Sequence, residues 1–409
     1  MAVPLVRPYV DILTTPRAWR FSLAAWFGRI MRATAGIGAI LLIAGNADNF
    51  ALAGAVSGSV VLGAALAGPL WSRAADARGQ TVVLPLAITA SIVAATALIA
   101  AVELNAPPWT WFVAAFLVGA SSIDAGSLAR ARWVHLLPTP EKRHAALALE
   151  AAGDEFTFVA GPPIVTLLAA LVSPAFGFAV GVGISVIGLA LLLLQRSTAP
   201  VPAPREARAG AWLPLTVLAL LAGYVGVGLQ FGTVDIAAVA IATDLDAPAV
   251  AGVLLAVFAV GSVISGLVFG TLSARWSPVR RVGIAGVAFA AVMPLFLLAH
   301  DAVSLGIISV LAGVVTTPVL IAGSSLIEQT VDRSTITSAM AWPTVGLSLG
   351  VTLGASLSGA AIDSGGAYSG MWVALIGGAL AGVCGIANAV IRRSPSRPPS
   401  PAATAPGGR

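Results

Sequence analysis

The stretch Gln195-Arg-Ser-Thr-Ala-Pro-Val-Pro-Ala-Pro-Arg-Glu-Ala-Arg-Ala-Gly210 interrupts a chain of 409 residues that is otherwise strongly hydrophobic. It is rich in proline, alanine and arginine and has no apolar periodicity, which is typical of a flexible linker. Apolar stretches of about 20 residues, long enough to span a bilayer, recur on both sides of it. Six such stretches precede the linker and six follow it, so this segment divides the chain into two halves.

The composition indicates a polytopic helical membrane protein. The chain is 58% hydrophobic and 10% charged, whereas soluble domains average about 25% charged residues. Backbone in lipid must be satisfied within helices or a closed barrel, and the alternating pattern of barrel strands is absent. We predict an all-α membrane protein with 12 transmembrane helices, at residues 20–43, 50–71, 80–101, 109–129, 145–171, 175–194, 212–240, 249–272, 281–299, 304–327, 335–361 and 370–391.

The charges of the connecting loops predict the orientation. With the N-terminus inside, all but two of the 22 lysines and arginines fall in cytoplasmic segments, and the external loops carry acids only. Positive charge is retained on the cytoplasmic side, so both termini are expected there. The rarity of lysine indicates a GC-rich bacterial genome and hence a bacterial plasma (inner) membrane. The basic residues are spread over short loops, which excludes a nucleic-acid surface, and the two exceptions are Arg29 and Arg32.

The halves are predicted to be related domains. Residues 1–194 form an N-terminal six-helix bundle, 195–211 a cytoplasmic linker, 212–393 a C-terminal six-helix bundle and 394–409 a disordered Pro/Ser-rich tail. A shift of 198 residues lays Ala51, Ala53, Gly54, Gly63 and Gly68 on Ala249, Ala251, Gly252, Gly261 and Gly266. Two pseudo-symmetric six-helix repeats are a known transporter architecture, with the site near the membrane midplane between them.

This organisation resembles the major facilitator superfamily over nearly the whole chain. In that family the loop between spans 2 and 3 reads approximately G-x-x-x-D-R-x-G-R-R, and residues 72–80 here read SRAADARGQ. A second copy after span 8, at residues 270–281, keeps the glycine and the arginines but loses the acid. The resemblance implies a cytoplasmic gate in which Asp76 helps to lock the halves together; the alternative is a solvated loop charge. The residues of this gate motif are Asp76, Arg78, Gly79, Gly270 and Arg275.

Span 5 carries Gly161-Pro162, which is similar to the core of a motif found there in proton-antiport exporters, although the surrounding glycines are missing. The stretch from Arg130 to Trp133 and the acids that follow it also resemble actinobacterial efflux-type members. The resemblance implies a secondary active transporter that works by alternating access, with proton-coupled export (antiport) of a drug or secondary metabolite. The alternatives are a proton-linked importer, a sugar or metabolite permease and, more remotely, a transport-dead sensor or a membrane-embedded enzyme.

Charged residues inside the spans of the N-terminal half are candidate site residues, because an ionisable group in lipid is costly and faces water or a partner. Arg29 and Glu155 lie about 14 and 18 Å along their spans at 1.5 Å per residue, so we predict that Arg29 pairs with Glu155 or Asp154. Arg32 shares the wet side of its helix with Arg29. Glu150 and Asp154 share a helix face at i,i+4, and Glu155 points about 100° away.

Two of these acids have another option. Glu150 and Asp124 lie nearer the cytoplasm and are able to reach it, or to pair with Arg130 or Arg132. Trp26 lies deep in span 1 and is a candidate to line the cavity.

Asp235 is the only acid in the predicted spans of the C-terminal half, and no basic residue lies in those spans except Arg281, at the cytoplasmic edge of one. Burial without a partner favours the neutral form of a carboxyl group. Asp235, Glu155 and Asp154 are therefore the candidates for binding and releasing a proton, and Gln230 is a candidate for substrate contact. Asp235 has two alternatives: direct contact with the substrate, or a place in an external loop if span 7 ends early.

The remaining residues exclude several kinds of site. The three histidines are scattered outside the predicted spans, which argues against a metal site and against an embedded enzyme. Cys384 is the only cysteine, and no Gly-rich phosphate loop with a lysine is present. We expect no cofactor. The expected partners are a small-molecule substrate, protons and the lipid bilayer, and the chain is expected to be a monomer.

Overall fold

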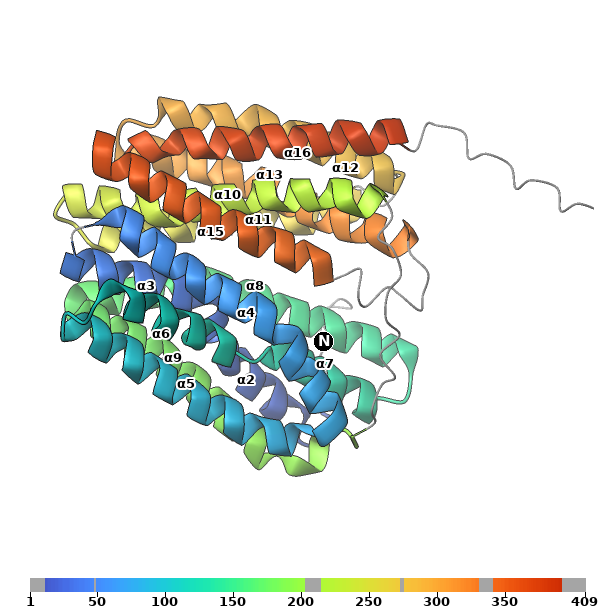
Figure 1. The fold of residues 1–409 in the computed structure, drawn as a ribbon. Coiled ribbons are helices and arrows are strands. Elements are labelled where there is room, and N and C mark those ends of the chain that lie inside the picture. Colours follow the sequence, from blue (N-terminus) through green and yellow to red (C-terminus); the bar gives the residue numbers. More distant parts are fainter. Residues whose placement is uncertain (1–11, 48, 203–214, 273–275, 331–340, 392–409) are drawn as a thin grey trace, which may run out of the picture.

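The computed structural model describes residues 12–47, 49–202, 215–272, 276–330 and 341–391, and within these ranges all regular structure is helical (Figure 1). The helices form two bundles, one from each half of the sequence, which lie side by side in Figure 1. This arrangement confirms the predicted all-α fold with two six-helix bundles. The tail at 394–409, most of the linker and Arg275 lie outside the described residues.

The N-terminal bundle contains six membrane-crossing segments, two of which are interrupted. The first consists of α2 (Ala18–Gly28) and α3 (Ile30–Ala47), which meet at Arg29, and the fourth consists of α6 (Pro108–Ser121) and α7 (Ala125–Leu136). The continuous helices are α4 (Phe50–Arg78), α5 (Gln80–Glu103), α8 (Pro140–Leu171) and α9 (Pro174–Leu194). A short 3-10 helix, η1 (Arg196–Thr198), begins the linker.

The C-terminal bundle contains α10 (Leu215–Asp244), α11 (Ala249–Leu272), α12 (Pro278–Val292) with the 3-10 helix η3 (Met293–Leu298), α13 (Ala302–Thr330), α15 (Ala341–Gly365) and, after η4 (Ser369–Met371), α16 (Trp372–Ile391). Within the described residues, 11 segments are long and apolar enough to cross a membrane. The twelfth is α8, whose Ala160–Leu171 part is apolar. Its other half carries Glu150, Asp154 and Glu155.

The interruption between α6 and α7 places unpaired backbone groups inside a membrane-spanning segment, where each needs a partner. The indole of Trp71 donates to the carbonyl of Ala120 at 2.7 Å, and the Ser91 hydroxyl donates to the carbonyl of Ser121 at 3.4 Å. On the other side of the break, the Asp124 carboxylate caps the start of α7. Side chains from α4 and α5 thus stabilise a break that brings Asp124 into the bundle.

Equivalent glycines hold equivalent helix pairs together in the two bundles. A Cβ on Gly63 would lie 2.2 Å from a backbone carbonyl of α6, and one on Gly261, 198 residues later, would lie 2.3 Å from a backbone carbonyl of α13. Gly119 and Gly313 make the reciprocal approach to α4 and α11, at 1.8 and 2.2 Å. Glycine is needed at these crossings because the helix backbones touch. The internal repeat in the sequence therefore has a packing counterpart.

The two bundles are joined where α4 packs along α15 (Figure 1). A Cβ on Gly54 would lie 2.3 Å from the carbonyl of Ala355, so these backbones are also in direct contact. The Thr352 hydroxyl donates to the carbonyl of Gly58 at 3.1 Å. A second junction brings Gly252 of α11 against Pro163 of α8. All these contacts between the two bundles lie in the half of the molecule nearer the predicted external end.

A carboxylate closes this junction at the predicted external end. Asp363, near the end of α15, accepts hydrogen bonds from the backbone N–H groups of Phe50 at 2.9 Å and Ala51 at 2.7 Å. These are the first residues of α4, whose N-terminal N–H groups have no partner within their own helix and carry a partial positive charge. We call this contact the Asp363 cap. It ties the C-terminal bundle to the N-terminal bundle.

Candidate functional site

Arg29 lies at the junction of α2 and α3, in the middle of the first membrane-crossing segment, and is only 3% exposed. Its guanidinium forms an ion pair and a hydrogen bond with the Glu150 carboxylate of α8. It also donates to the backbone carbonyl of Glu150 at 2.9 Å and lies 3.3 Å from the Asp154 carboxylate. A buried arginine is tolerated here because two acids from one face of α8 neutralise it.

Glu150 is fully buried and serves as the centre of this contact. Its carboxylate accepts hydrogen bonds from the Ser22 hydroxyl at 2.6 Å and the Trp133 indole at 2.7 Å, in addition to Arg29. The alternative in which Glu150 reaches the cytoplasm or pairs with Arg130 or Arg132 is wrong, because the side chain is buried against Arg29. The depth estimate compared backbone positions and did not include the reach of the Arg29 side chain, which contacts Glu150 together with Ser22 of α2.

Of the two partners predicted for Arg29, the structure shows Asp154 in contact with it. Glu155 has its backbone in α8, but its side chain lies outside the described residues. Sequence reasoning missed Ser22 and Trp133 as partners of the acid. The position of Trp133 directly after Arg130 and Arg132 in the sequence could have suggested that its indole N–H donates to a buried acid.

A second layer of ion pairs lies next to Arg29. Arg130 of α7 bridges Asp154 at 2.9 Å and Asp124 at 3.6 Å, and Arg32 of α3 lies 3.4 Å from the same Asp124 carboxylate. The Asp124 carboxylate also accepts from the backbone N–H groups of Gly126 and Ser127 at the start of α7. Asp124 therefore pairs with Arg130, which was one of the alternatives predicted for it from the sequence. It also pairs with Arg32.

These side chains form one connected group, which we call the six-charge cluster: Arg29, Arg32, Asp124, Arg130, Glu150 and Asp154. Three cations face three acids, so the group is neutral when all are ionised. Arg29 and Glu150 are sealed from solvent. The side chains of Arg32, Arg130, Asp154 and Asp124 are 43%, 33%, 32% and 27% exposed. Charged groups exposed within a membrane-spanning bundle are expected to face an aqueous cavity.

Trp26 lies on α2 next to the cluster and packs against α8. A Cβ on Gly153 would lie 2.3 Å from the indole nitrogen, so glycine at that position makes room for the ring. The Phe156 ring lies 6.1 Å from the Trp26 ring. The indole N–H is buried and has no partner among the described residues. Trp26 thus packs against the part of α8 that carries Asp154, and its contribution to a cavity stays a prediction.

Arg132 differs from the neighbouring arginines, because it is fully buried in a structural role. It donates to the Gln80 side chain at 2.8 Å, to the carbonyl of Gln195 at 2.9 Å and to the Thr198 hydroxyl at 2.8 Å. These bonds attach the start of the linker to α5 and α7. The first residues of the linker are therefore held in place.

In the C-terminal bundle, α10 continues to Asp244, nine residues beyond Asp235. Asp235 therefore lies about 13 Å inside the helix end at 1.5 Å per residue, and the alternative of a loop position is wrong. No ion pair of Asp235 occurs in the described part of the chain. Gln230 is fully buried and accepts from the Thr316 hydroxyl of α13 at 3.2 Å, while its amide nitrogen has no partner among the described residues.

The motif residues at the predicted cytoplasmic end lie apart from the cluster. Asp76 and Arg78 are exposed near the end of α4. Gly79 follows with φ 87°, a left-handed conformation that favours glycine, and a Cβ there would lie 3.0 Å from Pro202 of the linker. Gly270 lies near the end of α11, and Arg275 is not among the described residues.

The span 5 motif has a packing role. A Cβ on Gly161 would lie 2.9 Å from the Thr34 side chain, so glycine lets α8 approach α3 closely. Pro162 and Pro163 follow in the same helix, and Pro163 contacts Gly252 of the other bundle. The motif therefore sits where α8 touches both α3 and α11.

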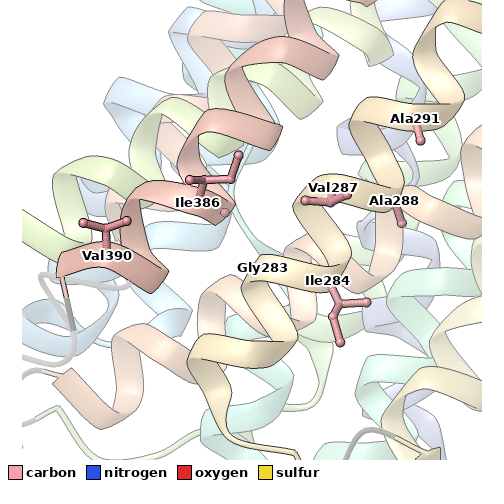
Figure 2. A pocket seen from close by; sticks show the side chains of 8 residues that line it. Gly283, Ile284, Val287, Ala288, Ala291, Ile386 and Val390 are labelled. Atoms are coloured by element: carbon pink, nitrogen blue, oxygen red, sulfur yellow. The ribbon is translucent and has the colours of Figure 1, made fainter. Parts of the chain in front are cut away.

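A groove of about 600 Å³ lies elsewhere, between α12 and α16 (Figure 2). It is lined by Gly283, Ile284, Val287, Ala288, Ala291, Gly385, Ile386 and Val390. All of these residues are apolar, and they belong to the bundle that does not contain the six-charge cluster. The groove therefore has no group that could orient a polar molecule or carry a proton. Within the described residues, no group of three or more metal-ligating side chains is present.

The sequence profile of the Major Facilitator Superfamily matches residues 21–226 and matches again at residues 220–408. The chain belongs to the major facilitator superfamily. The two matches correspond to the two bundles and bear out the resemblance noted in the sequence. No curated protein matches the chain in sequence.

Solved structures of transporters share the fold of this superfamily member at low sequence identity. A variant of nucleoside transporter NupG has a TM-score of 0.69 at 13% identity, covering 91% of this chain and 99% of that chain. A variant of peptide transporter POT in complex with alafosfalin has a TM-score of 0.69 at 13% identity, covering 92% and 94%. The human organic anion transporter TETRAN has a TM-score of 0.60 at 14% identity, covering 91% and 100%. At these identities the likeness concerns the fold.

Proposed function

We propose that this member of the superfamily is a proton-coupled secondary transporter that works by alternating access and exports a small organic molecule in exchange for protons. The observation that carries the proposal is the six-charge cluster inside the membrane-crossing part of the N-terminal bundle. Ionisable groups at such a depth are costly, and they commonly mark substrate or proton pathways. The partial exposure of four of the six side chains gives water or a substrate access to the cluster.

Asp154, Glu155 and Asp235 are the proposed proton carriers. A proton on Asp154 would neutralise the acid that lies 2.9 Å from Arg130 and 3.3 Å from Arg29. The loss of these attractions would change the relative stability of the outward- and inward-facing states, which is what coupling requires. Asp235 forms no ion pair within the described residues, so its protonation breaks none there.

Export is proposed on the likeness of Gly161-Pro162 to the antiport motif, and import of a polar metabolite is the second candidate. The fold likeness to nucleoside and peptide transporters does not distinguish export from import. We further propose a monomer without cofactor or catalytic activity, placed in a bacterial plasma membrane with both termini in the cytoplasm. The Asp76 motif is proposed as the cytoplasmic gate. Reporter fusions at each terminus test the orientation.

The proposal is tested by measuring the accumulation of a panel of labelled small organic molecules in bacterial cells that express the chain, with and without a protonophore. Asp154→Asn and Asp235→Asn are compared with Asp301→Asn, an exposed loop acid that contacts Ser304 at the start of its own helix α13 and the neighbouring His300. Export predicts reduced accumulation that the protonophore and the first two substitutions abolish and the third leaves intact. Raised accumulation would instead support import. No protonophore-sensitive change for any molecule would refute proton coupling.

A further inference from the structure

We propose that the transported molecule carries a carboxylate and that Arg32 and Arg130 bind this group between their guanidinium groups. This inference rests on the proposed transport function and names the substrate class of the same site. The decisive feature is the position of one oxygen atom of Asp124. Arg32 of α3 and Arg130 of α7 approach that Oδ2 atom from two different helices, at 3.4 and 3.6 Å.

Both contacts are long. Charge-assisted N–H···O bonds are typically about 2.7–2.9 Å, so neither arginine makes a full hydrogen bond to Asp124. The two guanidinium groups flank a carboxylate oxygen but hold it loosely. A carboxylate on a substrate could take the place of this oxygen and form the shorter, paired bonds that arginine favours.

Asp124 does not depend on these arginines for its own position. Its other oxygen, Oδ1, accepts from the backbone N–H groups of Gly126 at 3.0 Å and Ser127 at 3.2 Å. These bonds cap α7 and would remain when the guanidinium groups of Arg32 and Arg130 exchange Oδ2 for the substrate carboxylate as their partner. The exchange therefore leaves the break between α6 and α7 intact.

The four exposed side chains of the six-charge cluster have more unused hydrogen-bond donors than unused acceptors. An arginine has five N–H donors, and the side chain of Arg32 is the most exposed of the cluster at 43%. The exposed acids are better satisfied, because Asp124 accepts two backbone bonds and Asp154 faces both Arg29 and Arg130. Arg29 is buried against Glu150 and is not available. A ligand that supplies acceptors, an anion, fits this layer better than a cation.

The experiment measures binding and transport with probes that differ only in charge. 4-Phenylbutyrate and benzoate are the carboxylate probes, and their methyl esters are the uncharged partners. Binding is read from the ligand-dependent rise in the unfolding temperature of the purified chain in nanodiscs. Uptake and efflux of the labelled probes are measured in cells. The variants are Arg32→Gln, Arg130→Gln, Arg32→Lys and Asp124→Asn, with Arg280→Gln as the control, because Arg280 lies exposed at the start of α12 and stacks on Trp276.

We expect wild type to bind the carboxylates in preference to the esters. Each Arg→Gln change should weaken the binding of the carboxylate probes about 10-fold, which is equivalent to the loss of one charge-assisted contact of about 1.4 kcal/mol. Arg32→Lys should retain part of the affinity, because it keeps the charge without the paired geometry. Asp124→Asn should tighten binding, because it removes the competing charge, and Arg280→Gln should change nothing.

Two results would overturn the inference: equal binding of acids and esters by wild type, or unchanged carboxylate binding in both Arg→Gln variants. Failure of the transport function has a different signature, because the carboxylates would then bind with the expected variant pattern while no probe moved in a protonophore-sensitive way. Protonophore-sensitive transport restricted to neutral or cationic molecules would leave the proposed function standing and exclude the carboxylate.

Discussion

Under the proposed alternating-access mechanism, the Asp363 cap predicts that Asp363→Asn shifts the balance between the two access states. In the structure the carboxylate accepts from Phe50 N–H at 2.9 Å and Ala51 N–H at 2.7 Å, and so joins α15 to the N-terminus of α4 at the predicted external end. An outward-facing state requires the two bundles to separate at this end, which breaks both bonds. The cap therefore stabilises the externally closed state and has no counterpart in the open one.

The magnitude follows from what asparagine retains. Its amide oxygen can still accept one of the two bonds, but the charge and the second bond are lost. Hydrogen bonds to charged groups contribute about 1.5–3 kcal/mol, and solvent screening of the exposed Asp363 reduces this to about 1 kcal/mol. The ratio of closed to open molecules should therefore fall about 5-fold, since 1.4 kcal/mol is a factor of ten.

The assay is a distance measurement between spin labels on cysteines introduced at Leu104 and Leu245, which are 79% and 51% exposed at the predicted external end of the two bundles. The single native cysteine, Cys384, is first replaced by alanine. The matched control is Asp301→Asn. The pKa of Asp301 is held below its ordinary value chiefly by the backbone hydrogen bond from Ser304, so it is an ionised acid that caps a helix, but that helix is its own.

We expect a larger long-distance population in Asp363→Asn than in Asp301→Asn or the parent. Identical distance distributions in all three proteins would refute the reasoning, because the cap would then contribute nothing to closure. A larger closed population in Asp363→Asn would also contradict it, since the lost charge would then have opposed the junction.

Two further predictions concern stability and packing. Glu150→Gln leaves Arg29 buried without its main countercharge, which should cost about 3–5 kcal/mol and lower the unfolding temperature of the purified chain. Glu103→Gln, an exposed change at the end of α5, should leave that temperature within error of wild type. Equal temperatures for both variants would contradict the prediction. Gly119→Ala would place a Cβ 1.8 Å from a backbone carbonyl of α4 and should abolish the monodisperse peak in size-exclusion chromatography. Gly68→Ala, with nothing within 4 Å of the new Cβ, should keep that peak. A normal elution profile for both variants would show that the helices separate at little cost.

Much of the fold was predictable from the sequence, because each span reports its own hydrophobicity and each loop its own charge. The stretch 195–210 divided the chain, and the 198-residue offset related Gly63 to Gly261 before any packing was known. The structure then showed both glycines at equivalent helix crossings. These signals are local or repeat at a fixed interval, so no knowledge of tertiary contacts was needed to read them.

The candidate site was predictable only in its membership. Composition and depth selected Arg29, Asp154 and Asp124 as charges that need partners, and helical periodicity placed Glu150 and Asp154 on one face of α8. The sequence could not decide which partner each charge meets, because depth along a helix does not fix how neighbouring helices are rotated or where they break. The junction of α2 and α3 and the break before α7 set those rotations. Only the packed bundle decided that Glu150 is buried against Arg29 and that one oxygen of Asp124 lies between Arg32 and Arg130.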